Sequence, residues 1–434
     1  MKILYAASEA VPFCKTGGLA DVAGSLPPAL AEQGAETAVI LPLYRRVREK
    51  FADQLMFLCY DYVDLAWRHT YCGLFSMKKD GVTWYFLDNE QYFDRPELYG
   101  YVDDGERFGF FSRAVVKMLD HLEFWPDVIH CNDWQTALIP IYLKDDGVRE
   151  DRYRSIRTVL TIHNIEYQGR YDPYCLGDLF GLDRGWVDDG TLLLDGDLNL
   201  LKGAILTADA VNAVSPTYAQ ELKNPYFAHR MEGILTQCGY KLSGVLNGID
   251  MKLYDPAADG RITANYTAED LSGKAADKTA LQNLMGLNEE PNTPIIAMVS
   301  RLVSHKGLDL LREVMGDIME LPAQFVVLGS GDAGYEEFFR RTAERYPGRM
   351  AVRLGYNEAL SMAIYAGADL FLMPSRSEPC GLSQMISMRY GTVPIVRETG
   401  GLKDTVQPYE AWRDAGTGFT FANYNAGDMC HVIC

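Results

Sequence analysis

The sequence predicts an α/β protein built from two Rossmann-like domains, each with a doubly wound parallel sheet. Short apolar runs of strand length alternate with helical periodicity through the first half of the chain. This alternation stops in a turn-rich stretch at 244–256 and restarts after 292. The 434 residues also exceed what one hydrophobic core usually serves. We therefore expect a first domain over 1–244, a linker over 245–256 and a second domain over 257–434.

The first half is expected to form a parallel sheet covered by helices. The Pro27-Pro28 pair should interrupt the first helix, because neither residue has a backbone N–H to donate. In chain order, the expected elements are a strand at 2–7, a helix at 19–33, strands at 36–42 and 83–87, a helix at 106–122, a strand at 127–131, a helix from 134, a strand at 158–162, a helix at 198–206 and a strand at 210–214.

The second half is expected to repeat this plan after a polar stretch that extends to 292. Its alternation of apolar runs and helical periodicity again favours a parallel sheet between helices. The expected strands lie at 294–299, 324–328, 350–354, 369–373 and 393–396, and the expected helices at 308–319, 335–345, 358–366 and from 382 onward.

Composition limits the classes of partner. A formal net charge of −18 disfavours binding to nucleic acid and to anionic membranes, so neither is expected as a partner. The nine cysteines include no Cys-x-x-Cys pair, which is typical of reduced cytoplasmic thiols and not of a disulfide framework or a zinc site. The first residues do not resemble a signal peptide, and no apolar window reaches the length of a membrane span.

The turn at 374–384 is the stretch around which the functional prediction is organised. It follows a short apolar strand and precedes a helix, so its backbone N–H groups should point into a crevice at the carboxyl edge of a sheet. Anions bind at such edges. Glu378 lies in the turn itself, where its carboxylate can accept hydrogen bonds from hydroxyl groups. A phosphate cradle beside a carboxylate suits a sugar attached to a diphosphate.

Three other segments near strand ends supply candidate ligand-binding residues. Arg301 and Lys306 flank the loop after the first strand of the second domain, where two cations can neutralise a diphosphate leaving group. His163 ends the strand at 158–162, at the edge where ligands bind. Lys15 precedes Thr16-Gly17-Gly18, a string that recurs in the second half as Thr399-Gly400-Gly401 at another helix start.

Three further patterns have plainer explanations. Asp195-Gly196-Asp197 matches the Asp-x-Asp pattern of some metal-binding sites, but we interpret it as the capped first turn of a helix. The segment 130–134 contains a His and an Asp, and we interpret it as part of a cleft wall. The Gly-rich loop 329–334 matches the dinucleotide fingerprint, yet the next strand ends without the acid that would hold a ribose. We expect this loop to approach a nucleotide or its phosphates closely, without binding NAD.

Together these motifs resemble bacterial glycogen synthase and plant starch synthase, which form glycosyltransferase family 5. The resemblance covers nearly the whole chain. The matching strings are Lys15-Thr16-Gly17-Gly18-Leu19-Ala20-Asp21-Val22, His163-Asn164-Ile165, Leu246-Asn247-Gly248-Ile249-Asp250, Ser300-Arg301-Leu302 with Lys306-Gly307, Gly355-Tyr356-Asn357-Glu358, Tyr365-Ala366-Gly367-Ala368-Asp369, Pro374-Ser375-Arg376-Ser377-Glu378-Pro379-Cys380-Gly381-Leu382 and Arg389-Tyr390-Gly391-Thr392-Val393-Pro394.

The resemblance implies the GT-B arrangement, in which two Rossmann-like domains face each other across a cleft. It implies retaining transfer of glucose from ADP-glucose to the non-reducing 4-hydroxyl of an α-1,4-glucan, with neither metal nor cofactor. Its implied catalytic residues are His163, Arg301, Lys306 and Glu378. Its implied substrate-binding residues are Lys15, Gly18, Asp21, Asn164, Asn247, Tyr356, Cys380, Gly381, Leu382 and Ser383.

Within that set the resemblance assigns particular roles. Lys15 contacts the donor phosphate or sugar, His163 lines the glucose subsite, and Asn247 lies beside it. Arg301 and Lys306 stabilise the departing diphosphate. Tyr356 stacks on the adenine, Glu378 holds glucose hydroxyls, and the backbone N–H groups of 381–383 bind phosphate.

Two departures and two alternatives accompany the resemblance. Related retaining enzymes carry a second acid eight residues past the first, where this chain has Ile386, as glycogen synthases often do. The family usually continues for some tens of residues past the position of Cys434, so we expect reduced or absent activity for the 434-residue chain. The alternatives are a retaining transferase that uses UDP-glucose or another acceptor, and a fragment that binds glucan without catalysis. No nucleophile dyad is evident, which favours front-face attack assisted by the leaving phosphate.

Overall fold

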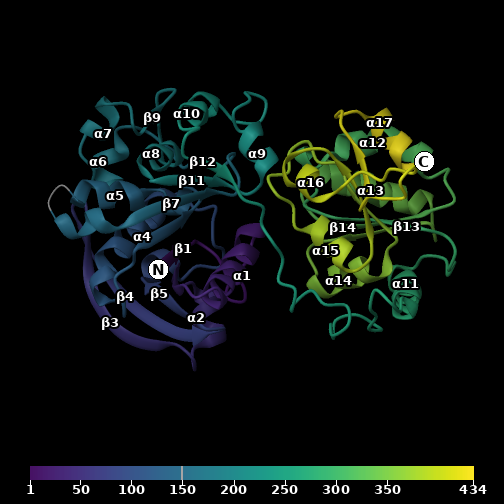
Figure 1. Ribbon diagram of the computed structural model, residues 1–434, viewed down its shortest axis with the longest axis horizontal. Helices are drawn as coiled ribbons and strands as arrows, with labels where there is room; N and C mark the ends of the chain where they lie inside the picture. Colours follow the sequence, from purple (N-terminus) through teal and green to yellow (C-terminus); the bar gives the residue numbers. More distant parts are fainter. Residues whose placement is uncertain (148–149) are drawn as a thin grey trace. The chain divides into compact units, whose positions relative to one another are not determined.

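The chain divides into two compact α/β units (Figure 1). The computed structural model describes residues 1–147 and 150–434. Unit 1 comprises Met1–Val214 and Ala219–Val245, and unit 2 comprises Ser215–Tyr218 and Leu246–Cys434. Each unit contains its own central sheet between helices, as alternating strands and helices require.

Unit 1 is organised around a nine-stranded sheet in the order β12-β11-β7-β6-β1-β2-β5-β4-β3. The strands from β12 to β5 pair in parallel; for example, Tyr5 lies between Val39 and His130. These strands are β1 (Lys2–Ala6), β2 (Glu36–Pro42), β5 (Val82–Asp88), β6 (Val128–Asn132), β7 (Arg157–Ile162), β11 (Ala210–Ala213) and β12 (Leu242–Gly244). Their side chains are largely buried, which matches the prediction of a parallel sheet covered by helices.

The edge of this sheet is antiparallel, which the prediction of a purely parallel sheet did not include. The hairpin of β3 (Met56–Leu65) and β4 (Arg68–Lys79) pairs with β5 in antiparallel register. Along β3, Val63 and Leu65 are buried whereas Tyr60 and Tyr62 are exposed. This alternation is typical of a strand with one face on the core and one face in solvent. Figure 1 shows β3 as the outermost strand of the unit 1 sheet.

The first helix, α1 (Gly18–Glu32), continues through Pro27 and Pro28. The predicted interruption is therefore wrong. Each proline removes one intrahelical donor, but Pro27 is buried together with an apolar face that includes Leu19 and Val22. Packing of this face against the sheet outweighs the two lost hydrogen bonds, because tertiary contacts supply most of the stability of a protein helix.

The remaining elements of unit 1 are short or cover the sheet. They are α2 (Arg45–Phe51), α3 (Glu90–Phe93), α4 (Asp104–Met118), α5 (Leu138–Gly147), α6 (Cys175–Phe180), α7 (Gly185–Asp188), α8 (Leu200–Thr207), α10 (Glu232–Gln237), β8 (Arg170–Tyr171), β9 (Leu193–Leu194) and β10 (Asp197–Asn199). The short helix α9 (Pro216–Glu221) contributes residues to both units. The 3-10 turns are η1 (Leu119–His121), η2 (Trp134–Thr136) and η3 (Asp151–Ser155).

The Asp195-Gly196-Asp197 string forms a hairpin turn and does not cap a helix. It joins the antiparallel strands β9 and β10, and both Asp195 and Gly196 have positive φ, at 52° and 90°. Two consecutive residues with positive φ are typical of a tight hairpin turn. The N-cap of α8 is instead Asn199, whose side chain accepts a hydrogen bond from the Lys202 N–H.

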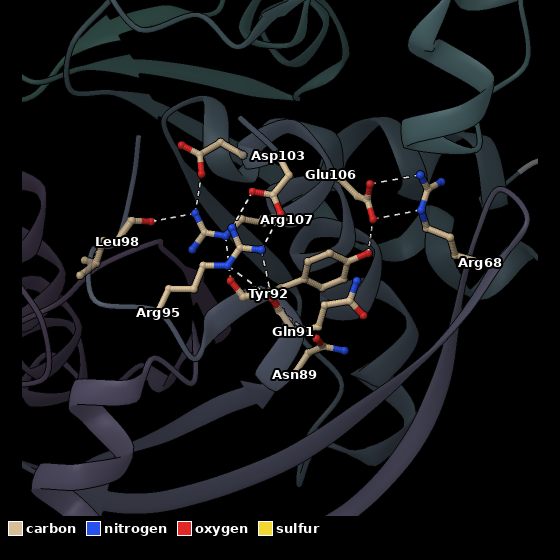
Figure 2. A network of polar contacts seen from close by, with 10 residues as sticks. Arg68, Asn89, Gln91, Tyr92, Arg95, Leu98, Asp103, Glu106 and Arg107 are labelled. Atoms are coloured by element: carbon tan, nitrogen blue, oxygen red, sulfur yellow. Dashed lines mark hydrogen bonds and ion pairs between the residues drawn. The ribbon is translucent and has the colours of Figure 1, made fainter. Parts of the chain in front are cut away.

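A polar network fixes the connection between β5 and α4 (Figure 2). The guanidinium of Arg107 is fully buried and donates to the carbonyl oxygens of Tyr92, at 2.8 Å, and Leu98, at 3.1 Å. The Tyr92 hydroxyl donates to Glu106, whose carboxylate also pairs with Arg68 of the β3–β4 hairpin at 3.0 Å. These bonds hold both the connection and the hairpin against α4.

Unit 2 contains a six-stranded parallel sheet in the order β15-β14-β13-β16-β17-β18. The strands are β13 (Ile295–Val299), β14 (Gln324–Gly329), β15 (Met350–Leu354), β16 (Leu370–Met373), β17 (Val393–Arg397) and β18 (Phe419–Phe421). The helices are α11 (Ser272–Met285), α12 (Leu308–Ile318), α13 (Ala333–Arg345), α14 (Glu358–Gly367), α15 (Ser383–Arg389), α16 (Gly400–Thr405) and α17 (Ala426–Ile433), with the 3-10 turn η4 (Ser304–Lys306).

Helices cover both faces of the unit 2 sheet. The side chains of α12, α13 and α17 form one core against it, and those of α11, α14 and α15 form a second core. The helix α11 lies inside the stretch predicted only as polar. Its sequence gave a weak apolar pattern, because Leu281 and Met285 are its main buried apolar side chains.

Cysteine pairing and helix length give two further observations. All nine cysteines are free thiols. Within residues 1–147 and 150–434, no helix is both long enough and apolar enough to cross a membrane.

Candidate active site

The unit 1 residues of the candidate site follow the carboxyl ends of β1, β6 and β7. The chain leaves β1 toward β2 on one side and leaves β6 toward β7 on the other, so the strand order reverses between β1 and β6. Ligands of doubly wound sheets bind at this kind of switch point, because the two loops diverge and leave a crevice.

His163 follows β7 and is held by Asn132 at the end of the neighbouring strand. Its Nε2 lies 2.9 Å from Asn132 Oδ1, which also accepts a hydrogen bond from the Tyr5 hydroxyl at 2.9 Å. Because Asn132 Oδ1 is an acceptor, His163 carries its proton on Nε2 and leaves Nδ1 as an acceptor. Burial, aided by the nearby His130, lowers the pKa of His163 to about 3. The imidazole is therefore neutral at physiological pH.

Asp133 belongs to the 130–134 segment, which the sequence analysis interpreted only as part of a cleft wall and did not include among the site residues. Its Oδ1 accepts hydrogen bonds from the backbone N–H groups of His163, at 2.7 Å, and Asn164, at 3.4 Å. Its backbone has φ 55° and ψ −171°, a region that only glycine adopts without strain. Burial raises the pKa of Asp133 to about 7, against the effect of the two N–H donors. A strained residue with a shifted pKa at a strand end is a functional-site candidate, and its place after β6 was the signal available in the sequence.

Lys15, Gly18 and Asp21 lie together at the start of α1. Lys15 Nζ pairs with Asp21 Oδ1 at 2.7 Å, and α1 begins at Gly18. The preceding loop is tied down by Glu9, which accepts hydrogen bonds from the Thr16 N–H and hydroxyl. Only 3% of Glu9 is exposed, and burial raises the pKa of this carboxyl to about 7. The sequence did not single out Glu9, although it lies three residues after the end of β1.

The unit 2 residues gather at a second switch point, between β13 and β16. The chain leaves β13 toward α12 on one face and leaves β16 toward α15 on the other. Lys306, from the first loop, pairs with Glu378, from the second, at 2.6 Å between Nζ and Oε2. Two of the predicted catalytic residues, 72 positions apart in the sequence, are therefore in direct contact.

Glu378 is buried yet remains charged. Burial alone would raise its pKa, but the Lys306 ammonium and the hydrogen bonds from Lys306 and Ser375 outweigh burial, so the pKa of Glu378 lies below its ordinary value. The Ser375 hydroxyl donates to Glu378 Oε2 at 2.9 Å. An ammonium has three N–H donors, so Lys306 can bind Glu378 and still donate to an anionic ligand.

Arg301 lies exposed in the same loop as Lys306, and this loop is supported by two glycines. A Cβ at Gly329 would lie 1.8 Å from the Ser300 carbonyl oxygen, and a Cβ at Gly331 would lie 2.4 Å from the Leu302 carbonyl oxygen. The glycines of the dinucleotide-like loop thus permit close approach of the chain's own backbone. The expectation that this loop also approaches a nucleotide stays a prediction.

The turn after β16 brings together several predicted substrate-binding residues. Cys380 is buried, and its sulfur accepts a hydrogen bond from the backbone N–H of Asn247, although burial raises the pKa of the thiol to about 12. Gly381 has φ +71°, and Leu382 precedes the first residue of α15, Ser383. Free N–H groups at a helix start attract anions, so this turn can receive a phosphate.

Tyr356 lies at the far edge of the same sheet, in the loop after β15, with 69% of its surface exposed. Three strand spacings of about 4.8 Å separate β15 from β16, a distance of about 14 Å. An extended nucleotide diphosphate spans a distance of this order. Tyr356 and Glu378 thus lie at the same carboxyl edge without touching.

Comparison with known proteins identifies related families for both units. The starch synthase catalytic domain family matches residues 2–237, and the glycosyl transferases group 1 family matches residues 284–433. Proteins named glycogen synthase from Bacillus cereus and Lactobacillus acidophilus are 48% and 47% identical over 433 residues, covering 100% of this chain and 91% of theirs.

Two solved structures are also similar to this chain. The catalytic domain of starch synthase IV from Arabidopsis thaliana, bound to ADP and acarbose, superimposes with a TM-score of 0.90 at 34% identity, covering 99% of this chain and 90% of that one. A sucrose-phosphate synthase from Thermosynechococcus elongatus shares the fold alone, with a TM-score of 0.60 at 18% identity over 100% of this chain and 88% of that one. The chain belongs to the glycogen synthase and starch synthase family of glycosyltransferases.

Proposed function

We propose that this protein is a glycogen synthase, which transfers glucose from ADP-glucose to the non-reducing 4-hydroxyl of an α-1,4-glucan and retains the anomeric configuration. The observation that carries this proposal is the Lys306–Glu378 pair at the β13/β16 switch point, beside the start of α15. It provides a cation and helix N–H groups for a diphosphate and a charged carboxylate for sugar hydroxyls. The ADP in the Arabidopsis starch synthase structure supports the choice of donor.

Unit 2 is proposed to bind the donor. Lys306 and Arg301 bind the diphosphate, because an ammonium and a guanidinium both stabilise phosphate oxygens. The N–H groups of 381–383 contribute at the same turn. Glu378 holds the glucose hydroxyls, and Tyr356 stacks on the adenine. Asn247 and Cys380 support this turn from the interior, consistent with their mutual hydrogen bond.

Unit 1 is proposed to bind the sugar groups near the reacting carbon. His163, neutral because of its lowered pKa, accepts a hydrogen bond from a sugar hydroxyl at Nδ1. Asp133 positions it through the backbone of His163 and Asn164. Lys15, paired with Asp21 at the start of α1 beside Gly18, donates a further hydrogen bond to a phosphate or to the sugar.

The proposed reaction is front-face attack. The acceptor 4-oxygen forms a bond to C1 of glucose while the bond from C1 to the diphosphate oxygen breaks, and the acceptor proton moves to that leaving oxygen. The products are the glucan longer by one glucose and ADP. Cations positioned at the leaving oxygens lower the barrier, because charge grows there in the transition state. Trapping a covalent glucosyl-enzyme on Glu378 would contradict this route.

The test is incorporation of labelled glucose from ADP-glucose into glycogen by the 434-residue chain and its Lys306→Ala variant. Loss of one preorganised cation should lower kcat/KM by about 10²–10³. A matched control is Lys278→Ala. Lys278 pairs with Asp369 at 2.8 Å, and Asp369 lies at the amino end of β16, whereas the candidate site lies at the carboxyl ends of the strands. This control should retain activity, which separates catalysis from loss of a half-buried ion pair.

Other outcomes would redirect the proposal. Equal turnover of UDP-glucose would contradict ADP-glucose as the preferred donor. Retention on immobilised glycogen without any incorporation of label would favour a glucan-binding protein without catalysis. We also propose a cytoplasmic location, which the nine free thiols support.

A further inference from the structure

The β3–β4 hairpin exposes a cluster of aromatic side chains on its outer face. Tyr60 and Tyr62 of β3 are 58% and 43% exposed, and Tyr71 of β4 is 37% exposed. The register pairs Tyr62 with Tyr71 and Asp64 with His69, so these residues share one face of the hairpin. We call Tyr60, Tyr62, His69 and Tyr71 the tyrosine platform.

The four rings form a continuous series of ring contacts from His69 through Tyr62 and Tyr60 to Tyr71. Tyr62 and His69 stack with ring centroids 4.7 Å apart and planes 7° apart, and Tyr60 lies 5.8 Å from Tyr71 and 6.2 Å from Tyr62. Tyr60 is opposite Gly73, where a Cβ would lie 2.5 Å from the Tyr71 hydroxyl. The glycine therefore leaves room for Tyr71 to lie across its strand, which extends the aromatic surface.

The platform is fixed in position. The turn of the hairpin is anchored by Arg68, which pairs with Glu106 at 3.0 Å (Figure 2) and stacks on Trp67 at 4.4 Å. Trp67 in turn donates to Asp178 at 2.7 Å. On the inner face of the hairpin, Val63 and Leu65 are buried. An exposed surface held this rigidly loses little conformational entropy when it binds a ligand.

The composition of the platform is unusual for an edge strand. Edge strands of soluble proteins are commonly protected by charged side chains; this one carries Asp61 and Asp64, but it also exposes the rings of Tyr60 and Tyr62. Side-chain pairs directly opposite each other stabilise a hairpin. This effect accounts for the presence of Tyr62 and Tyr71, which are opposite each other on the two strands. Tyr60 has Gly73 directly opposite it and meets Tyr71 only diagonally, and it remains the most exposed of the three tyrosines.

The chemistry of the platform selects a neutral, hydroxyl-rich ligand. Phenol rings offer apolar faces with a polar edge, and sugar rings offer the complementary apolar faces and hydroxyl rims. Asp64, which contacts His69 at 2.6 Å, adds a carboxylate acceptor. The carboxylate and the net charge of −18 disfavour nucleic acid, which would also stack on aromatic rings.

We propose that the tyrosine platform is an α-glucan binding site separate from the reaction site, at which a segment of the polymeric acceptor docks. This inference rests on the proposed function for its choice of ligand. Within unit 1 the platform lies on the edge strand, with β4, β5 and β2 between β3 and β1. A polymer can occupy such a site while its end reacts elsewhere, so the platform raises affinity for glycogen but not for a short acceptor.

The test compares the 434-residue chain with its Tyr60→Ala/Tyr62→Ala variant. Dissociation constants for glycogen are measured by affinity gel electrophoresis without donor, and KM values are measured for glycogen and maltotriose. Loss of two rings should weaken glycogen binding about tenfold and raise the KM for glycogen, with kcat and the KM for maltotriose unchanged. The Tyr60→Phe/Tyr62→Phe variant, which keeps both rings, should retain most of the affinity.

A matched control is Tyr174→Ala, because Tyr174 is 88% exposed but lies outside the platform. Unchanged glycogen affinity in the Tyr60→Ala/Tyr62→Ala variant, or an equal loss in Tyr174→Ala, would overturn the proposal. So would a rise in KM for both acceptors. A lower oligomeric state of the double variant than of the unaltered protein in light scattering, at unchanged glucan affinity, would also overturn it and would make the face an interface between copies. If the double variant does not fold, Tyr60→Ala alone decides the question.

Failure of the proposed function has a different signature. In that case the unaltered protein transfers no glucose to either acceptor, while binding of glycogen without donor still reports on the platform.

Discussion

At the scale of single residues, the presence or absence of a neighbouring cation divides the buried carboxylates of the candidate site into two kinds. Glu9 and Asp133 of unit 1 lie in surroundings that raise their pKa to about 7, because burial penalises the charged form. Glu378 of unit 2 is also buried, but the Lys306 ammonium keeps its pKa below the ordinary value. The buried carboxyl groups of unit 1 thus have pKa values near neutral pH, whereas Glu378 of unit 2 stays charged at that pH.

Glu9→Gln should change how stability depends on pH. Between pH 4.5 and about 7 the unfolded chain releases the Glu9 proton while the folded chain keeps it, so wild-type stability falls as pH rises through this window. The amide of the variant does not titrate. The variant should therefore gain stability relative to wild type from pH 4 to pH 8, by about 3 kcal/mol. Chemical denaturation at several pH values measures this difference.

The control for this prediction is Glu320→Gln, which alters an exposed carboxylate. Its stability curve should run parallel to that of wild type. Parallel curves for Glu9→Gln as well would mean that Glu9 does not keep its proton in the folded protein, and the proposed origin of its raised pKa would be wrong.

At the scale of elements, the candidate site depends on how closely loops approach one another. The loop after β13 bears Arg301 and Lys306, and it lies against the loop after β14 through a bridge between Leu302 and Gly331. The Leu302 N–H donates to the Ser330 carbonyl oxygen at 2.8 Å. Glycine at 329 is required because the Ser300 carbonyl occupies the space that a Cβ would take.

Gly329→Ala and Gly316→Ala form a matched pair of substitutions. The first inserts a Cβ 1.8 Å from the Ser300 carbonyl oxygen and should destabilise the protein by about 2 kcal/mol or more. It should also weaken ADP binding, because it displaces the loop that bears Arg301. The second adds a Cβ in open space within α12 and should stabilise the protein by about 0.5–1 kcal/mol.

Denaturant unfolding and calorimetric titration with ADP measure both effects. Equal stability of the two variants would show that the loops can separate without cost. In that case the close approach of the backbones would not be what holds Arg301 in place.

At the scale of the whole molecule, the chain consists of two units that each have their own sheet and their own switch point. The proposed donor-binding residues 301–383 all belong to unit 2. A ligand that binds only the folded form of one unit stabilises that unit by mass action. Binding of the nucleotide sugar should therefore raise the free energy of unfolding of unit 2 directly.

ADP should protect unit 2 before it protects unit 1. At a concentration about 100 times its Kd, ADP should stabilise the folded form of unit 2 by about 2.7 kcal/mol. Amide hydrogen exchange should show slowed exchange in β13, β16 and α15. Lys306→Ala should lose most of this protection, and adenosine without phosphates should give little. Protection confined to unit 1 would contradict assignment of the donor to unit 2.

The sequence by itself determined the alternation of strands and helices and the strand-end positions of Lys15, His163, Lys306 and Glu378, because apolar periodicity and turn residues are local properties. Only the tertiary structure decided the antiparallel β3–β4 edge, the continuity of α1 through two prolines and the contacts of Asp133. It also decided that Gly329 meets backbone and that burial shifts the titration of Glu9. Each of these depends on which distant segments become neighbours, and a sequence pattern carries no direct information about the neighbours that remove water from a side chain or occupy its space.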